Sequence, residues 1–280
     1  MKEFNKKFLV FLGGLLPLFL WPFLLPSNNL IYTRAKQEIN NIFIGDSHVQ
    51  LSINDNILSN TANFAINSES TYFSYYKLKK ILSENSNIKK IYLGFSYHNI
   101  SSYYDEFIYG KRAQDILPRY FDLLPFREKL RCMPLKVSVF YRNYINVKKN
   151  GINHGYDNKF ISTSAIKKHM IKRVNTQFFT DSGDVLSFSE INIQYLKKIK
   201  DLVRTEDIEL IILKVPVHPY YSKLIPNEYI EKFNNLMLEH QLVTLDFNSI
   251  VLDDSCFIPD GDHVSLKGAD ILSSYLKNKE

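Results

Sequence analysis

Short apolar runs alternate with amphipathic segments along most of this chain. The clearest strand pattern is Ile208 to Val215, in which branched apolar residues dominate. Such a run is typical of a central parallel strand that is covered on both faces. Between Glu190 and Arg204 the apolar residues instead recur with the period of a helix. The alternation predicts an α/β fold built on a doubly wound parallel sheet.

The remaining elements of the sheet are shorter. We expect strands at Ile42 to Ile44, Asn63 to Ile66, Lys89 to Gly94 and Leu242 to Phe247, and helices at Thr71 to Leu82, Glu228 to His240 and Leu266 to Leu276. A segment from 101 to 187, rich in Tyr, Phe and basic residues, interrupts the alternation. We expect it to form helices and loops over one end of the sheet. Ligands of such sheets bind at the carboxyl ends of the strands, so polar residues there are candidates for a site.

An uncharged apolar run, Phe8 to Leu25, follows three lysines near the N-terminus. Its eighteen residues would span about 27 Å as a helix, just enough to cross a bilayer core. We therefore expect residues 1–29 to be a single-pass signal anchor and residues 30–280 to be extracytoplasmic, in the periplasm or at the cell surface. A cleaved signal peptide and a buried soluble helix are the alternatives. The first lacks a small-x-small cleavage site, and the second would be less uniformly apolar.

The composition is that of a globular protein, with 45% hydrophobic and 14% aromatic residues. The net charge of +6 is concentrated in one segment, because fifteen Lys and Arg face only four acidic residues between Lys111 and Arg173. This basic segment is either a solvated surface or a patch that meets anionic headgroups or an acidic glycan. Nucleic acid is not an expected partner beyond a membrane anchor. Cys132 and Cys256 are expected to be two buried thiols, with a single disulfide as the alternative.

Candidate chemistry lies at opposite ends of the predicted domain. In NIFIGDSH, Ser47 directly follows the first strand. A nucleophilic serine needs a base, and that base needs a third group to orient it. In PDGDHVSLKGA, just before the last helix, a turn at Gly261 can fold the carboxylate of Asp260 onto the imidazole of His263. Ser47, His263 and Asp260 are therefore candidates for a catalytic triad.

GDSH after the first strand, together with DGDHVSLKGA before the last helix, resembles the SGNH (GDSL-type) hydrolase superfamily. The resemblance covers roughly residues 40 to 278 and leaves the middle segment as an insertion. It implies a flavodoxin-like sheet, with Ser47 as nucleophile, His263 as base and Asp260 as orienting acid. Asp262 would be a neighbour, because the family spacing is Asp-x-x-His. No metal and no organic cofactor are implied.

The residues expected to stabilise an oxyanion depart from the family pattern. Where the family has a glycine after the second strand, this chain has Asn67 and Ser68. Where the family has an asparagine after the third strand, this chain has Ser96, and Asn99 follows three residues later. Loss of one oxyanion donor raises the barrier by about 2.7–4 kcal/mol. A slow or altered enzyme, or an inactive relative, would fit this departure.

Three further histidines are candidates for the site. We expect His48 to make a local hydrogen bond or a substrate contact. His98 and His218 follow the third strand and the central strand, so both are expected at the ligand edge of the sheet. A zinc site formed by these three residues is conceivable, but their spacing does not demand one, and no metal is predicted.

The combined pattern predicts serine-dependent acyl transfer by an O-acetyl esterase or O-acetyltransferase. A tethered domain of this kind is similar to bacterial proteins that act on cell-surface polysaccharides, with a membrane acyl-donor protein as a candidate partner. Two other classes are kept as alternatives. One is an inactive SGNH-like module that binds glycan or scaffolds an envelope polysaccharide pathway. The other is a lipid esterase in which the basic and aromatic insertion acts as a lid.

Overall fold

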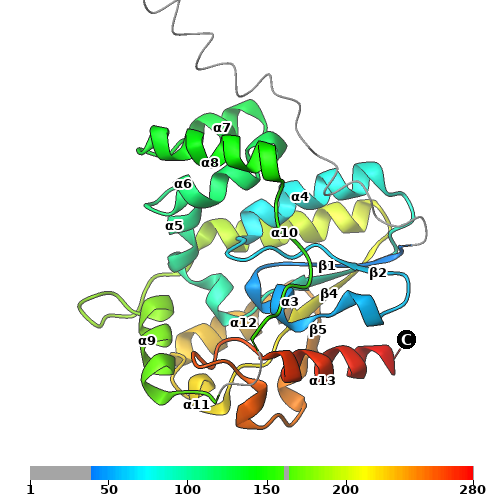
Figure 1. Cartoon of the computed structure of the whole chain (residues 1–280), viewed down its shortest axis with the longest axis vertical. Helices are drawn as coiled ribbons and strands as arrows, with labels where there is room; N and C mark the ends of the chain where they lie inside the picture. Colours follow the sequence, from blue (N-terminus) through cyan, green and yellow to red (C-terminus); the bar gives the residue numbers. More distant parts are fainter. Residues whose placement is uncertain (1–38, 161–163, 280) are drawn as a thin grey trace, which may run out of the picture.

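The computed structural model describes residues 39–160 and 164–279 of the chain. At the centre of this part lies a parallel five-stranded sheet with the strand order β2-β1-β3-β4-β5 (Figure 1). This is the strand order of flavodoxin-like, doubly wound sheets, so the predicted α/β architecture is confirmed. The strands are β1 (Asn41–Ile44), β2 (Thr61–Asn63), β3 (Lys90–Gly94), β4 (Glu209–Lys214) and β5 (Val243–Asp246).

Helices cover both faces of the sheet and extend beyond it. The α-helices are α3 (Ser47–Ser52), α4 (Thr71–Glu84), α5 (Asp105–Ile108), α6 (Ala113–Ile116), α7 (Phe126–Arg131), α8 (Val137–Asn150), α9 (Lys167–Phe178), α10 (Glu190–Thr205), α11 (Pro219–Ser222), α12 (Asn227–Glu239) and α13 (Leu266–Lys277). Short 3-10 helices are η1 (Asp55–Ile57), η2 (Tyr97–Ile100), η3 (Ser102–Tyr104), η4 (Leu117–Arg119), η5 (Phe121–Leu123), η6 (Phe247–Ser249) and η7 (Asp254–Cys256). The four helices predicted from periodicity, α4, α10, α12 and α13, are confirmed.

Consecutive residues of β1 point to opposite faces, as the period of a strand requires. Ile42 and Ile44 belong to a core shared with α4, α10 and α12, whereas Phe43 belongs to a second core with α3 and α13. β4 divides its residues in the same way, with Ile212 on the first face and Leu213 on the second. Burial on both faces explains why these strands are apolar at successive positions.

Most of the segment from 101 to 187 is helical and extends one of these cores. Figure 1 shows α5 to α8 stacked beyond α4 and α10, with α9 beside α11. Tyr120 links this segment to α4, because its ring stacks on Phe73 at 4.4 Å between centroids. Its hydroxyl also donates to Glu69, just before α4, at 2.8 Å. The segment is therefore packed onto the sheet through α4.

The second strand, Thr61–Asn63, lies earlier in the chain than the predicted Asn63 to Ile66 and shares only Asn63 with that prediction. The Asn63 side chain turns inward, where Oδ1 accepts from the N–H of Ala65 at 2.9 Å and Nδ2 donates to Ile53 O at 2.8 Å. The backbone still follows β1, since the N–H of Ile66 donates to Gly45 O at 3.0 Å. The asparagine side chain thus replaces part of the regular ladder.

The predicted anchor, residues 1–29, lies outside the described residues. Within the part of the chain that is described, no helix combines the length and apolar character needed to cross a membrane. Cys132 and Cys256 are both buried and unbridged, which confirms the prediction of two thiols.

Gly94, the last residue of β3, allows α3 to lie close to the sheet. A Cβ at this position would lie 2.2 Å from Cγ2 of Val49 in α3, well inside van der Waals contact. Its next neighbour, Ile44 O, would lie at an ordinary 3.5 Å. The contact between Gly94 and Val49 therefore helps to set the position of the helix that begins with Ser47.

We expect Gly94→Ala to lower the free energy of unfolding by about 1–3 kcal/mol, because the added methyl group overpacks this contact. Urea denaturation followed by circular dichroism measures the change. The same substitution should lower the free energy of unfolding by less in a Val49→Ala background, because that background lacks the clashing Cγ2. Equal costs in the two backgrounds would show that this contact is not the cause.

Candidate active site

Ser47 is the first residue of α3, at the carboxyl end of β1 and beside the point where the strand order reverses. Asp46 caps the helix, since its side chain accepts a hydrogen bond from the N–H of His48 at 3.0 Å. Ser47 is only 8% exposed and lines a cavity of about 710 Å³. The strand, the cap and the helix together hold the serine at the wall of this cavity.

Ser47, His263 and Asp260 form one continuous chain of contacts. The Oγ of Ser47 lies 2.8 Å from Nε2 of His263, and Nδ1 of His263 lies 2.8 Å from Oδ2 of Asp260. Next to an ionised Asp260, Nδ1 carries the proton and donates, which leaves Nε2 to accept from the serine hydroxyl. The structure thus brings together three residues from opposite ends of the domain.

The turn at Gly261 folds Asp260 onto His263, as the sequence suggested. Gly261 has a φ of +63°, and a Cβ there would lie 2.4 Å from Sδ of Met170 in α9. Oδ1 of Asp260 also accepts from the N–H groups of Asp262 at 3.0 Å and His263 at 3.2 Å. The backbone of the turn therefore orients the carboxylate together with the imidazole.

His218 supports this turn and does not line the cavity. Its backbone N–H donates to Gly261 O at 2.7 Å. Its Nδ1 accepts from the N–H of Tyr220 at 3.0 Å, and its Nε2 lies 3.1 Å from Oδ1 of Asp254. His218 thus follows β4 at the carboxyl edge of the sheet, but both of its ring nitrogens contact neighbouring loops rather than the cavity.

A buried carboxylate, Asp46, gathers the residues that follow β3. Oδ2 of Asp46 lies 2.9 Å from Nε2 of His98 and accepts from Nδ2 of Asn99 at 3.0 Å. The hydroxyl of Tyr104 donates to the same oxygen. Burial would raise the pKa of Asp46, but its interactions with His98 and the other donors outweigh burial and hold this pKa below its usual range.

His98 and Asn99 are therefore directed toward Asp46, Ser96 contacts these two residues, and none of the three lines the cavity. Both ends of the Asn99 amide are engaged, because its Oδ1 accepts from the N–H of Ser96 at 2.8 Å while its Nδ2 serves Asp46. The hydroxyl of Ser96 lies 3.4 Å from Nδ1 of His98. This placement corrects the expectation that the residues after the third strand supply oxyanion donors.

Asn67 and Ser68 do line the cavity, together with Gln50 of α3, which sequence reasoning missed. The N–H of Asn67 donates to Oε1 of Gln50 at 2.8 Å, so this backbone donor is already used. Because an N–H can only donate, the Gln50 atom facing it is the oxygen, and the amide NH₂ points elsewhere. The available signal was the Ser-x-x-Gln spacing of Ser47 and Gln50, which places both on one side of a helix.

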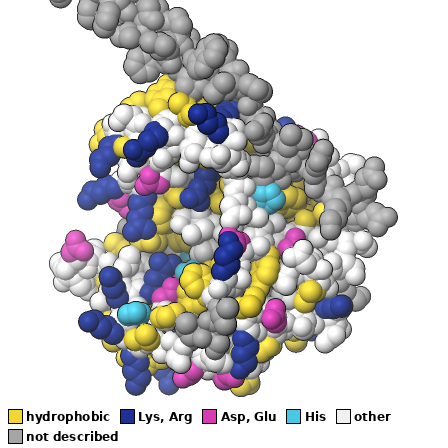
Figure 2. Space-filling model, viewed as in Figure 1, with side chains coloured by type: hydrophobic (Ala, Val, Ile, Leu, Met, Phe, Trp, Pro, Cys, Tyr) yellow, Lys and Arg dark blue, Asp and Glu magenta, His cyan; other side chains and the backbone are white. Residues whose placement is uncertain are grey.

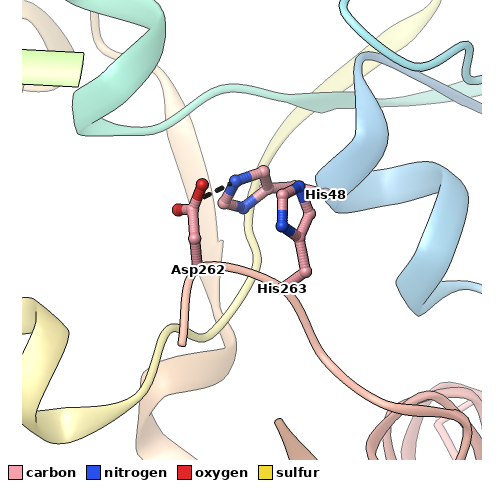
Figure 3. A group of neighbouring side chains, drawn as sticks. All are labelled: His48, Asp262 and His263. Atoms are coloured by element: carbon pink, nitrogen blue, oxygen red, sulfur yellow. Dashed lines mark ion pairs between the residues drawn. The ribbon is translucent and has the colours of Figure 1, made fainter. Parts of the chain in front are cut away.

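His48 is buried beside two other imidazoles. Its ring centroid lies 4.0 Å from that of His98 and 4.8 Å from that of His263. Its Nε2 lies 3.1 Å from Oδ1 of Asp262, the ion pair drawn in Figure 3. Burial would lower the pKa of His48, but the charge and hydrogen bond of Asp262 and the charge of Asp46 together outweigh burial and raise this pKa above its usual value. Burial and the neighbouring His48 charge lower the pKa of His98.

Asp262 is fully buried and contacts His48, not the imidazole of the triad. Its Oδ2 accepts from Nε of Arg173 at 2.7 Å and from Nε2 of Gln177 at 2.9 Å. Burial would raise the pKa of Asp262, but His48 and Arg173 hold this pKa well below its usual range. Asp262, His48 and Arg173 therefore form an ionised cluster that packs against the imidazole of His263.

His48, Asp262 and His263 also bring three potential metal ligands within 4.8 Å of one another (Figure 3). Their contacts do not suit a cation. Both nitrogens of His263 are engaged by Ser47 and Asp260, and Arg173 already brings a positive charge to Asp262. This donor set fits a proton-transfer and ion-pair network better than a metal centre.

No protein-family model matches the chain, and no curated protein matches it. Among solved structures, a protein from Streptococcus pneumonia named for platelet activating factor shares 16% identity, with coverage of 95% of this chain and 98% of that chain and a TM-score of 0.45. A protein from Bacteroides fragilis named as an acylhydrolase shares 8% identity, with coverage of 92% and 91% and a TM-score of 0.40. A GDSL-like lipase from Bacteroides thetaiotaomicron shares 9% identity, with coverage of 88% and 90% and a TM-score of 0.38. At these values the likeness assigns neither a reaction nor a substrate to this chain.

The raised pKa of His48 has a measurable consequence. Imidazole NMR titration should show His48 still protonated above its ordinary pKa of 6.5, and Asp262→Asn should lower the His48 pKa. Because the folded-state pKa is raised, its contribution to stability is complete below the unfolded-state pKa and is lost as the pH rises through the folded-state pKa. Asp262→Asn should therefore reduce the loss of stability on the alkaline side.

Asp181→Asn provides the matched control, because Asp181 is an exposed carboxylate on the surface. It should leave the His48 titration unchanged. A His48 pKa that is the same in the wild type and in Asp262→Asn would contradict the assigned ion pair.

Proposed function

We propose that this protein catalyses acyl transfer through a covalent acyl-serine, as an O-acetyl esterase or O-acetyltransferase. The observation that carries the proposal is the unbroken contact chain from Ser47 through His263 to Asp260, at the wall of a cavity of about 710 Å³. A serine, a base and an orienting carboxylate in this arrangement are the parts that acyl transfer requires.

In the first step, Oγ of Ser47 attacks the ester carbonyl while Nε2 of His263 accepts the hydroxyl proton. Collapse of the tetrahedral intermediate breaks the ester bond, and the imidazolium gives its proton to the leaving alcohol. Water or an acceptor hydroxyl then attacks the acyl-serine, with His263 again as base. Burial raises the pKa of Asp260, but the charge and hydrogen bond of His263 outweigh it, so Asp260 stays ionised and stabilises the imidazolium.

The oxyanion needs donors other than the Asn99 amide and the N–H of Asn67, because both are engaged. The backbone N–H of Ser47 is one donor, since N–H groups in the first turn of a helix have no partner within the helix. The amide NH₂ of Gln50 is the second. Its carbonyl is held by Asn67, and its side chain lines the same cavity as Ser47.

The proposed substrate is an acylated polysaccharide outside the cytoplasm, reached from the membrane through the predicted N-terminal anchor. Gln50, Asn67 and Ser68 border the cavity near Ser47, and such polar side chains suit a sugar ester better than an alkyl chain. If an acceptor hydroxyl replaces water, the acyl group comes from a donor that a membrane partner protein supplies.

Ser47→Ala should abolish covalent labelling by a fluorophosphonate and lower the turnover of p-nitrophenyl acetate by more than about a thousandfold. Asp260→Asn keeps the serine, but the turnover of p-nitrophenyl acetate should fall by about a hundred- to ten-thousandfold, because the imidazole loses its orienting partner. Ser83→Ala removes an exposed hydroxyl from α4 and serves as the control. Equal labelling and turnover in the wild type and in Ser47→Ala would contradict the proposal that Ser47, His263 and Asp260 act as a catalytic triad.

Gln50→Ala should lower kcat by about tenfold to a thousandfold with little change in KM, because an oxyanion donor acts mainly in the transition state. Gln50→Glu keeps an acceptor for the N–H of Asn67 but places negative charge beside the oxyanion, so it should be at least as damaging. Circular dichroism of both variants checks the fold. A Gln50→Glu variant with the kcat of the wild type would contradict the proposal that Gln50 donates to the oxyanion.

The engagement of Asn99 and Asn67 also favours a second candidate, a glycan-binding module without turnover. This candidate predicts that oligosaccharides bind in the cavity while no turnover depends on Ser47. The chain-length preference among ester substrates distinguishes a lipid esterase from the proposed glycan enzyme. A lipid esterase would hydrolyse long acyl esters and leave acetylated glycans unchanged.

A further inference from the structure

Among the residues that the structure describes, the lining of the cavity beside Ser47 carries more positive than negative charge. Its basic lining residues are Arg112, Arg119, Lys159 and Arg173. Two of them have carboxylate partners, since Arg173 pairs with Asp262 at 2.7 Å and Lys159 with Asp157 at 2.9 Å. Arg112 and Arg119 have no carboxylate partner within the described part of the chain.

Arg119, the last residue of η4, is linked through Asn67 to the helix that begins with Ser47. It donates to the carbonyl of Asn67 at 2.9 Å, and the N–H of Asn67 donates in turn to Gln50 on the helix that carries Ser47. This series of contacts places the guanidinium in the same cavity lining as Asn67 and Gln50. A guanidinium has five N–H donors, so the single bond to Asn67 leaves most of them for a ligand.

Arg112 approaches the same cavity from the start of α6. It donates to the hydroxyl of Tyr103 at 2.8 Å, and its guanidinium carbon lies 5.4 Å and 5.3 Å from the ring centroids of Tyr103 and Phe107. Both rings also line the cavity. The aromatic faces orient the guanidinium without neutralising it.

The acidic residues of the cavity lining compensate for only part of this charge. Asp157 pairs with Lys159, whereas Asp260 keeps one negative charge, because the imidazole of His263 is neutral while its Nε2 accepts from Ser47. Two guanidinium charges, those of Arg112 and Arg119, therefore face one carboxylate charge. All four basic lining residues belong to the basic segment recognised in the sequence, from Lys111 to Arg173. Figure 2 shows Lys and Arg side chains gathered over the part of this face that holds α5 to α9. Part of the basic segment is thus turned toward the proposed reaction centre.

We propose that the acylated substrate carries a negatively charged group, a carboxylate or phosphate on the glycan, which binds Arg112 and Arg119 while the ester lies at Ser47. This inference rests on the proposed acyl transfer and names its substrate class, an acylated anionic polysaccharide. The cavity volume of about 710 Å³ lies within the range of ligand sites, about 300–1,000 Å³. Guanidinium groups match carboxylate and phosphate through paired hydrogen bonds.

Calorimetry on the full-length chain tests the site with ligands that have no ester. The probes are trigalacturonate, which has carboxylates, a glycerol phosphate trimer, and cellotriose, which is neutral. At least one anionic probe should bind, and cellotriose should bind at least tenfold more weakly. Arg112→Gln and Arg119→Gln should each weaken anion binding by about tenfold, the loss expected for one hydrogen bond to a charged group.

Lys172→Gln is the matched control, because it removes one positive charge from an exposed position of α9 outside the cavity lining. It should leave binding unchanged. Arg119→Lys keeps the positive charge but not the paired hydrogen-bond geometry of a guanidinium. Its affinity for the anionic probe should lie between those of the wild type and Arg119→Gln. Equal binding of anionic and neutral probes, or an equal loss in Lys172→Gln, overturns the proposal.

A kinetic comparison separates this inference from the proposed function. O-acetylated trigalacturonate should show a higher kcat/KM than O-acetylated cellotriose, and Arg119→Gln should reduce that preference. Turnover of p-nitrophenyl acetate that depends on Ser47 but shows no preference between the two glycans would overturn the anion site and leave the acyl transfer intact. Absence of turnover with selective anion binding would overturn the acyl transfer and leave the anion site intact.

Discussion

The arrangement of the site depends on the burial of one ionised carboxylate, Asp46. A buried carboxylate must be satisfied by several donors, because the cost of its desolvation is otherwise prohibitive. One oxygen caps α3 and so places Ser47, while the other gathers His98, Asn99 and Tyr104. The same requirement explains why the Asn99 amide is turned away from the serine. Stabilising the start of α3 and supplying an oxyanion donor are competing uses of one side chain.

A second buried carboxylate, Asp262, organises the other side of the triad. It pairs with His48 and Arg173, and the His48 ring lies against both His98 and His263. The charges behind the triad are thus matched one to another inside the protein. In the cavity in front of it, the partners of the Arg112 and Arg119 guanidinium groups within residues 39–160 and 164–279 are neutral. This difference between the two sides is what suggests an anionic substrate.

Much of the fold could be predicted because apolar periodicity reports burial directly. The runs around Ile42 to Ile44 and Ile208 to Val215 correspond to strands that are covered on both faces, and the amphipathic segments correspond to α4, α10, α12 and α13. The early end of β2 was missed, since it depends on the Asn63 side chain bonding to Ile53 and Ala65. Periodicity carries no information about such a side-chain contact.

For the site, the sequence alone determined the candidates that local spacing can reveal: Ser47 at a strand end, and Asp260 with His263 around a glycine turn. Only the tertiary structure decided which polar groups are already used. The partners of Oδ2 of Asp46 lie 52, 53 and 58 residues away, and no local pattern encodes those contacts. Likewise, Gln50 is recognised as a candidate oxyanion donor only because the fold places it in the cavity lining with Ser47. The same holds for Arg112 and Arg119, whose positive charges lie in that lining. Hydrogen-bond and charge balance are properties of neighbours in space, and these neighbours are distant in sequence.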